Sequence, residues 1–377
     1  MENIEYFLQI LKDFIWEKES LDLKYVDWAH MKKDAHRHQV EAIFYKQTHK
    51  AEFQKAFATQ AYFSINRNRL VDELRIALKD FEFVFVKGLE IAKYYPYPEL
   101  RTMGDSDLLV HFDDKVAIHK IFIQLGYSFE DYHEEEAKYI KNNLEIEMHD
   151  KLLHVLDDDK DSVLFFDQVW HYVHNGELDW NFHMIYLLKH LSRHLLSGGA
   201  GFRQFMDIAI LTQKLTLDWN WIEHELEKIK LLKFSKRVFE LNNIWFEIKP
   251  PMEVDELDPM FVKDATKRIY ECGVFGQTSK DKDIVSIANK AKDGNNPLWV
   301  VKASYMLTHL FPSYSTMMKN EFCQYLRTKK LLLPVAWVHR WIRYSTNEKK
   351  RKTLQKKLCS SYKDIKQRND YLSSWGL

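Results

Sequence analysis

Two carboxylates separated by one residue stand at the start of an apolar run. Asp105 and Asp107 lead into residues 108–110, Leu-Leu-Val, which predict a strand. Side chains alternate across a strand, so residues i and i+2 project from one face, roughly 7 Å apart. Two carboxylates this close repel each other unless a cation lies between them. Mg²⁺ binds through one or two carboxylates together with substrate phosphates, so Mg²⁺, or Mn²⁺ in its place, is the expected cofactor.

A third acidic residue is expected from the segment 144–149. Its apolar residues alternate with Glu145, Glu147 and His149, which predicts a strand with one buried face and one polar face. If this strand pairs beside the one that begins at Asp105, a third carboxylate joins the first two. Three carboxylates can hold one or two Mg²⁺ ions, orient a triphosphate and deprotonate an attacking hydroxyl, as phosphoryl and nucleotidyl transfer require. A solvated strand face would carry the same residues, so this alternative stays open.

A lysine and a glycine follow an aromatic, β-branched segment that predicts a strand at 81–86. Gly88 lets the backbone approach a phosphate closely at the turn into a helix, and Lys87 supplies a positive charge there. An ordinary strand-to-helix turn is the alternative. The Gly-x-x-x-x-Gly-Lys-Ser/Thr spacing of a P-loop does not occur at this turn, which argues against that class of ATPase.

The elements that position these residues form a small block with mixed periodicity. After the strand at 81–86 we predict a helix at 89–95, a proline-bearing loop at 96–101 and a helix from 115 to 125. Asn142-Asn143 predicts a hairpin turn between strands at 138–141 and 144–149. The expected fold class is therefore α+β, with a small mixed-sheet core at 81–165.

The rest of the chain shows helical periodicity. Apolar stripes predict helices within 1–80, and after the core at 183–196 and 202–215. We therefore expect an N-terminal helical region at 1–80 and a C-terminal helical region at 166–377. A core of about 90 residues buries little surface by itself, so we expect the later helices to pack against it and close its cleft. His190, His194, Arg203 and Asp207 would lie near that seam.

The composition limits the function classes. The 377 residues contain 55 Lys+Arg and 55 Asp+Glu, so no net charge attracts the chain to nucleic acid or anionic membranes. No apolar run is long enough to cross a membrane. The three cysteines are odd in number and widely spaced, which indicates a reducing compartment, and the cytoplasm is the expected location. They show no spacing typical of metal ligands.

Several motifs together resemble a known family. They are Lys87-Gly88, Tyr95-Pro96-x-Pro98-x-Leu100-Arg101-x-Met103-Gly104-Asp105-x-Asp107-Leu108-Leu109-Val110, Gly126-Tyr127 and Glu147-Met148-His149. They are similar to an uncharacterised bacterial family, NTP_transf_5, of the nucleotidyltransferase superfamily. Segment 28–45, the His190-x-x-x-His194 spacing with Arg203 and Asp207, and segments near 273–276 and 310–337 extend the resemblance over most of the chain.

The resemblance implies roles for individual residues. Asp105 and Asp107 would be metal ligands and Glu147 the third metal-binding and catalytic acid, with Glu145 on the same face as the reserve. A further set would bind the substrate: Lys87, Gly88, Arg101, His149 and Arg203.

The implied activity is a Mg²⁺-dependent transfer of a nucleoside monophosphate from NTP to an acceptor hydroxyl on a small molecule, a protein or RNA. Two other readings stay open, a catalytically silent nucleotide-binding module and a helical interaction scaffold. For His190 and His194, polar contacts at the seam between domains, or at most a place in a substrate cleft, are favoured over a zinc pair, because no His-Glu-x-x-His motif accompanies them.

Overall fold

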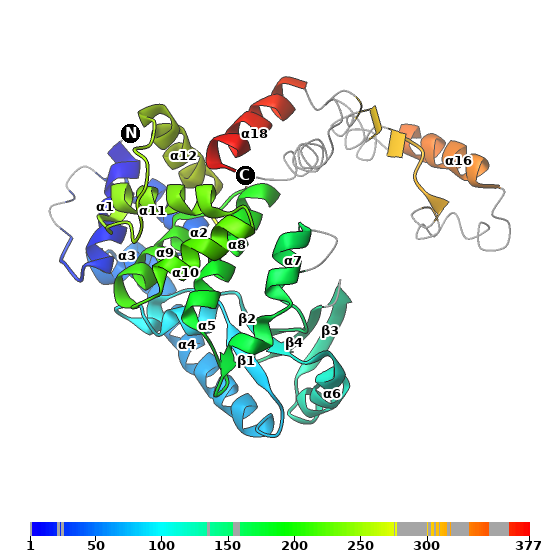
Figure 1. Cartoon of the computed structure of the whole chain (residues 1–377), viewed down its shortest axis with the longest axis horizontal. Coiled ribbons are helices and arrows are strands. Elements are labelled where there is room, and N and C mark those ends of the chain that lie inside the picture. The colour runs from blue at the N-terminus through cyan, green and yellow to red at the C-terminus, as the bar shows by residue number, and fades with distance from the viewer. Residues whose placement is uncertain are drawn as a thin grey trace. The chain divides into compact units, whose positions relative to one another are not determined.

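The structure, a computed structural model, describes most of the chain up to residue 276 and parts of it beyond residue 300 (Figure 1). The described residues are 2–20, 23, 26–133, 136–153, 159–274, 276, 300, 303–304, 307–308, 310–314, 317, 332–346 and 362–377. They divide into two compact units. The first holds the described residues from 2 to 194 and from 199 to 276, with Gly376, and the second holds 195–198, the described residues from 300 to 375, and Leu377.

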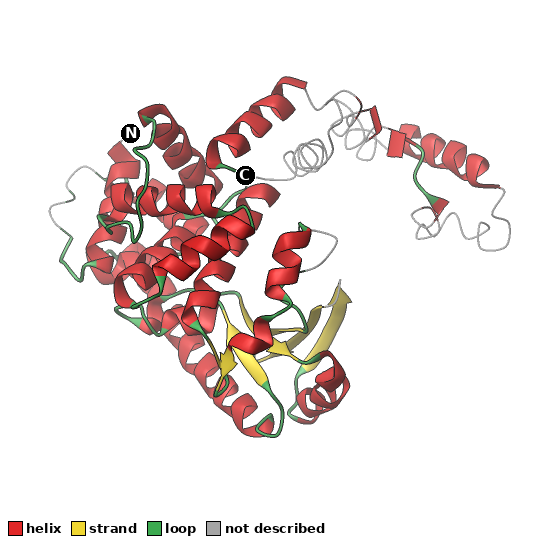
Figure 2. Cartoon of the chain, viewed as in Figure 1, coloured by secondary structure: helices red, strands yellow, loops and turns green. Residues whose placement is uncertain are grey.

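The first unit contains a five-stranded sheet, drawn in yellow in Figure 2. Its strand order is β1-β2-β5-β4-β3. Only the β2–β5 pair is parallel, and the other three pairs are antiparallel. Strands β6 and β7 form a separate two-stranded antiparallel sheet. The strand bounds are β1 Phe83–Val86, β2 Asp105–Val110, β3 Ser128–His133, β4 Glu136–Lys141, β5 Leu144–His149, β6 Val173–His174 and β7 Glu177–Leu178.

Two helices cover the apolar face of the sheet. The 27-residue α4 (Ala51–Ala77) contributes Leu70 and Leu74, and α6 (Lys115–Gln124) contributes Ile118 and Phe122. These side chains join the even-numbered residues of β2 and β5 in one buried cluster, which includes Leu108, Val110, Ile146 and Met148. The odd-numbered residues of both strands are thereby turned to the opposite face. Packing on one side of the sheet thus fixes which side carries the polar residues.

The remaining helices of this unit precede and follow the sheet. Before it come α1 (Glu2–Ile15), α2 (Trp28–His38) and α3 (Glu41–Thr48), and α5 (Gly88–Ala92) follows β1 directly. After the sheet come α7 (Lys160–Phe166), α8 (Trp180–Ser197), α9 (Phe202–Lys214), α10 (Trp219–Lys228), α11 (Leu232–Phe246) and α12 (Pro259–Cys272). Short 3₁₀ turns lie at Pro98–Leu100, Phe112–Asp114 and Val169–Tyr172.

A buried histidine joins the N-terminal helices to the later ones. The backbone N–H of Phe202 donates to Nδ1 of His38 at 3.0 Å, and Nε2 of the same ring donates to the carbonyl of Tyr270 at 3.1 Å. Burial lowers the pKa of His38 to about 3, so the ring stays neutral and keeps one donor and one acceptor. One side chain of α2 therefore connects the start of α9 to α12.

The second unit is described by two helices, α16 (Leu333–Thr346) and α18 (Tyr362–Trp375). The indoles of Trp337 and Trp341 in α16 donate to the carbonyls of Pro312 and Leu310, each at 2.9 Å. Within the described residues of either unit, no helix is long and apolar enough to cross a membrane.

The α+β class and the main elements of the core are confirmed. The hairpin between β4 and β5 turns at Asn142 and Asn143, whose φ angles of 54° and 60° are those of a primed turn. The edge strand β3 was not predicted, because its segment, 128–133, is polar and borders the hairpin without a clear apolar face. Segment 293–297, Asp-Gly-Asn-Asn-Pro, and the lysine-rich segment 349–357 lie outside the residues that the structure describes.

Candidate active site

The parallel pairing of β2 and β5 brings the predicted acidic residues to one face. Asp107 is the register partner of Glu147, and Asp105 is the partner of Glu145. The next step of the same ladder pairs Leu109 with His149. Odd-numbered positions of both strands share the polar face, so the side chains of Asp107, Glu147 and His149 project from the sheet side by side.

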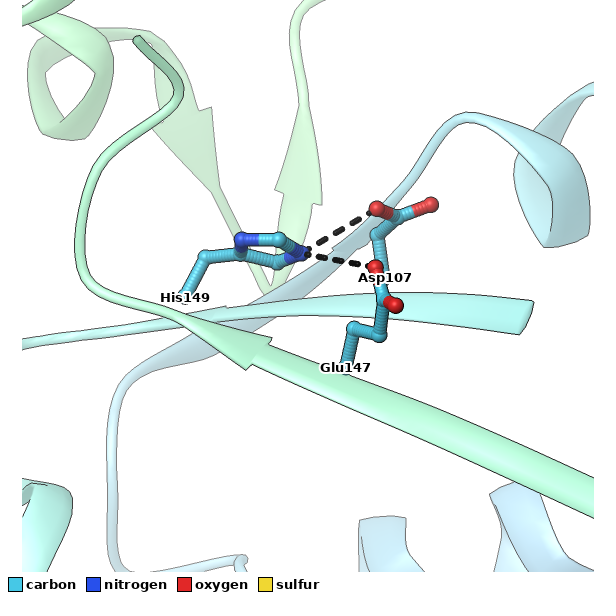
Figure 3. A group of neighbouring side chains, drawn as sticks. All are labelled: Asp107, Glu147 and His149. Atoms are coloured by element: carbon cyan, nitrogen blue, oxygen red, sulfur yellow. Dashed lines mark hydrogen bonds and ion pairs between the residues drawn. The ribbon is translucent and has the colours of Figure 1, made fainter. Parts of the chain in front are cut away.

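Asp107, Glu147 and His149 form a compact group of possible metal ligands (Figure 3). One ligand atom from each residue lies within 4.8 Å of the other two. Nε2 of His149 is 3.2 Å from Oδ1 of Asp107 and 3.9 Å from Oε2 of Glu147, and its ring faces both carboxylates. Two carboxylates and one imidazole are a donor set that suits a divalent cation such as Mn²⁺ or Mg²⁺.

The other two acidic residues near this group have different neighbours. Glu145 forms an ion pair with Lys138 of β4, whose Nζ lies 3.6 Å from Oε1 of Glu147. Glu136, at the start of β4, places its carboxylate 3.5 Å from Nδ1 of His149. A carboxylate behind the second ring nitrogen orients a metal-binding histidine in many sites. Glu136 was not predicted, because nothing in the sequence ties it to a histidine thirteen residues later.

A buried ammonium group neutralises Asp107. Nζ of Lys87 is 2.6 Å from Oδ1 of Asp107 and 5.8 Å from the centre of the Tyr186 ring. Burial alone would lower the pKa of Lys87, but Asp107 and then Tyr186 outweigh that effect, so the pKa is raised. Burial likewise favours the neutral form of Asp107, but Lys87 and His149 hold its pKa well below the usual range. Both groups are therefore charged at neutral pH.

The turn that carries Lys87 has an unusual backbone. Lys87 itself has a φ of 57°, while Gly88, the residue expected to need conformational freedom, is not in the positive-φ region. The Lys87 N–H donates to Nε2 of His183 in α8 at 3.0 Å. A Cβ on Gly88 would lie 3.1 Å from Nη1 of Arg101 and 3.2 Å from the sulfur of Met103. A larger residue would require Arg101 or Met103 to shift by a few tenths of an ångström, so Gly88 serves close packing here and not a positive φ.

Burial and carboxylate repulsion disfavour the charged forms of the other two acidic groups on the polar face. Burial and the neighbouring carboxylates of Asp105 and Asp107 raise the pKa of Glu147 to about 8. Burial, followed by repulsion from Asp107, also raises the pKa of Asp105. A raised carboxyl pKa means that the folded protein disfavours the charged form at that position. The polar face therefore crowds together more carboxyl groups than Lys87 can neutralise, as expected of a cation site.

Arg101 is held by protein groups. Its Nε and Nη2 each lie 2.8 Å from an oxygen of Asp207 in α9, and Nη1 donates to the carbonyl of Gly88 at 3.1 Å. The hydroxyl of Tyr95 donates to the same carboxylate at 2.6 Å. The expected closeness of Asp207 to the core is thus observed as a buried, bidentate ion pair. In this arrangement Arg101 fixes the Gly88 turn against α9.

Three further side chains hold the segment before Asp105. Gln60 of α4 donates to the carbonyls of Glu99 and Arg101, at 3.0 and 3.1 Å. Arg67, also in α4, donates to the carbonyl of Met103 at 3.0 Å, and Arg203 donates to that of Thr102. Gln60 and Arg67 were not predicted. The sequence shows only that each is a polar residue of a predicted helix, and it does not show whether such a side chain binds a backbone carbonyl or faces solvent.

His190 and His194 lie on α8 with their Nε2 atoms 2.9 Å apart. Burial and then the positive charge of Lys87 lower the pKa of both, that of His194 to about 4. The ring of Tyr186, which lies near the Lys87 ammonium, is 6.2 Å from the ring of His190, so the pair lies beside the polar face. Arg203 interacts with both Asp105 and His194. His190, His194, Arg203 and Asp207 therefore all belong to the surroundings of the sheet, as expected for the seam.

Comparison with known proteins gives one result. No curated protein and no solved structure matches the chain. The model of a family described as "Uncharacterised nucleotidyltransferase", NTP_transf_5, matches residues 24–247. This span is more than half of the 377 residues and includes the whole sheet with every predicted site residue. The chain belongs to this uncharacterised nucleotidyltransferase family.

Proposed function

We propose that the protein transfers a nucleoside monophosphate from an NTP to an acceptor hydroxyl, with Mg²⁺ or Mn²⁺ as cofactor and pyrophosphate as the second product. The observation that carries this proposal is the group of Asp107, Glu147 and His149 on paired strands, with ligand atoms within 4.8 Å of one another. Membership of a nucleotidyltransferase family supports the reaction class.

The residues at the polar face fit a divalent cation. Asp107 and Glu147 offer oxygen ligands and His149 offers a nitrogen, while Asp105 adds a further carboxylate one register step away. The raised pKa of Glu147, about 8, reflects a negative charge that a bound cation would compensate. Such an ion, when bound, neutralises phosphate charge and lowers the pKa of a nearby hydroxyl.

The side chains around the cation site would accept the proton, bind the phosphates and hold the turn in position. In the transfer, the acceptor oxygen forms a bond to the α-phosphorus while the bond to the pyrophosphate oxygen breaks. Glu147 would accept the hydroxyl proton, since a bound cation would favour its carboxylate form and a carboxylate beside the acceptor hydroxyl can act as general base. The Lys87 ammonium would bind the phosphates, and the ion pair of Arg101 with Asp207 would keep the Gly88 turn in place.

The acceptor and the compartment complete the proposal. We infer an acceptor that presents a hydroxyl group, on a small molecule, a protein or RNA. A cytoplasmic location fits the use of NTP and the three widely spaced cysteines. These two inferences do not depend on which base the NTP carries.

The test is a panel of NTPs with Mg²⁺ or Mn²⁺. Binding to the folded state raises the melting temperature by mass action, so thermal shifts identify the nucleotide, and pyrophosphate release then measures turnover. Asp107→Asn should abolish turnover. Asp72→Asn changes an exposed aspartate of α4 in the same way and should behave as the wild type.

The outcomes separate the competing functions. Nucleotide binding without metal-dependent pyrophosphate release would identify a silent binding module and contradict catalysis. No thermal shift with any NTP would leave the helical scaffold as the better description. Release that persists in Asp107→Asn would show that the activity does not come from this site.

A further inference from the structure

The inner face of α8 carries a continuous row of aromatic and imidazole rings. Trp180, His183, Tyr186, His190 and His194 are spaced by three or four residues, which places them on one side of the helix. Successive ring centres lie 4.6, 6.4, 6.2 and 4.5 Å apart. The row begins beside the Lys87 turn and continues beyond it.

The two ends of the row have different surroundings. His183 is buried and accepts the Lys87 N–H, and Tyr186 lies beneath the Lys87 ammonium. His190 and His194 extend the row past Lys87 and are only partly buried. The first half thus supports the turn, while the second half presents two neutral imidazoles at the edge of the polar face.

Several positive charges act on this second half. Those that act on His194 include Lys87, Arg203 and Arg193, while Lys87 and Arg193 act on His190 together with the negative charge of Asp107. Arg203 comes from α9, is partly exposed, and has an Nε without a hydrogen-bond partner. Burial, followed by the nearby charge of Arg101, lowers the pKa of its guanidinium, so its charge is incompletely compensated. An anion at this position would receive hydrogen bonds and remove the excess charge.

We propose that His190, His194 and Arg203 form a polyphosphate subsite that takes the β- and γ-phosphates of the NTP, with Lys87 between this subsite and the carboxylates that hold the metal. This inference rests on the proposed function, since it assigns one part of the same substrate. It places the departing pyrophosphate along α8 and leaves the Glu147 and His149 side of the sheet for the acceptor.

The arrangement favours an anion over a metal ion as the occupant. Lys87, Arg193 and Arg203 would repel a divalent ion from His194, and this outweighs both the i, i+4 spacing of the two imidazoles and the attraction of Asp107 near His190. Among the described residues, the group of three or more potential metal ligands is Asp107, Glu147 and His149, and neither His190 nor His194 belongs to it. Arginine is well suited to phosphate because its planar donors match the phosphate oxygens.

The test measures binding of sodium tripolyphosphate to the full chain by calorimetry, at low ionic strength and with EDTA present. The substitutions His190→Gln, His194→Gln and Arg203→Gln should each weaken binding about 10- to 100-fold, the usual worth of a hydrogen bond to a charged group. His224→Gln in α10 and Arg69→Gln in α4 change exposed residues of the same types and should leave the affinity unchanged. Arg203→Lys keeps the positive charge, so it serves as a second variant if Arg203→Gln fails to fold.

Two further measurements separate the possible outcomes. The same variants should lower the affinity for NTP far more than that for the matching nucleoside monophosphate, which a purely structural defect would not do. Unchanged tripolyphosphate affinity in all three variants would overturn the subsite, as would tight Zn²⁺ binding that depends on His190 and His194 without any effect on tripolyphosphate. Because no turnover is needed, histidine-dependent binding without pyrophosphate release would refute the transferase activity while retaining the anion subsite.

Discussion

Lys87 and Asp107 form a buried ion pair in which Nζ lies 2.6 Å from Oδ1, the same oxygen that faces His149. The ammonium therefore supplies positive charge to one of the proposed metal ligands. A divalent cation bound at Asp107 would compete with Lys87 for this carboxylate. Lys87 would then be free to bind a phosphate, so one side chain can serve the protein in its empty and its loaded state.

Replacing Lys87 should separate metal binding from catalysis. Lys87→Met removes the competing cation, so we expect Mn²⁺ to bind roughly tenfold more tightly, an estimate from the interaction of two nearby charges. Turnover should fall, because the phosphate contact is lost. Calorimetric titration with Mn²⁺ and a pyrophosphate assay measure the two effects, and Lys79→Met, at an exposed position, is the control. Weaker Mn²⁺ binding in Lys87→Met would contradict the competition.

Replacing Asp105 and replacing Asp107 should change the stability of the fold in opposite directions, although we expect both carboxylates to be needed for activity. The lowered pKa of Asp107 stabilises the fold at neutral pH, and this contribution is lost as the pH falls through that pKa. Asp107→Asn should therefore lower the melting temperature. The raised pKa of Asp105 has the opposite sign, so Asp105→Asn should raise the melting temperature at pH 7 in EDTA.

Turnover should fall at least a hundredfold in both aspartate variants, since a metal site supplies several kcal/mol of stabilisation in the transition state. Thermal unfolding and pyrophosphate release test the two statements separately. Equal changes in melting temperature would show that the electrostatic environments of the two carboxylates have been misassigned.

Glu147 should make the stability of the metal-free protein depend on pH. Its folded pKa of about 8 lies above the usual value of 4.5, so the folded protein holds a proton that the unfolded chain releases. Stability should therefore decline as the pH rises from about 4.5 to 8, and Glu147→Gln should remove this decline. Urea unfolding in EDTA at several pH values measures it. Glu52→Gln, at an exposed position of α4, is the matched control, and a pH profile of Glu147→Gln identical to that of the wild type would refute the assignment.

Breaking the pair of Arg101 and Asp207 should cost stability. Arg101→Met leaves a buried carboxylate without its cation, a change that typically costs about 3–5 kcal/mol. Asp207→Asn should be destabilising too, and the double variant less so than the sum of the two. Urea unfolding of the four proteins gives the coupling energy. Strictly additive effects would mean that the ion pair does not act as a unit.

The acidic part of the site was predictable because it depends on local periodicity. The alternation in 144–149 places Glu147 and His149 on the polar face, and the Asp105–Asp107 spacing does the same for β2. The sequence did not indicate that β2 and β5 pair in register, which follows from the shared core beneath them. His149 was expected among the substrate contacts, whereas the structure groups it with Asp107 and Glu147.

The supporting contacts were less predictable because they join distant parts of the chain. Arg67 binds a carbonyl 36 residues away, and His183 receives an N–H from 96 residues before it. No periodic pattern encodes such a contact, since the same histidine on a helix face would pack equally well against apolar neighbours. The positive φ of Lys87 could not be predicted either. A positive φ in this turn would be assigned to the adjacent Gly88, because glycine adopts that conformation most easily.

The hydrogen bond between the Lys87 N–H and His183 has a consequence for any attempt to divide the protein. A non-glycine residue at positive φ persists only where its surroundings enforce it, and here the partner lies in α8, outside the sheet-containing segment. A fragment limited to residues 81–165 would keep every strand of the sheet but lose this acceptor. Such a fragment would present its carboxylates beside a Lys87 turn without its hydrogen-bond acceptor, so a fragment that keeps the candidate site intact must extend through α8.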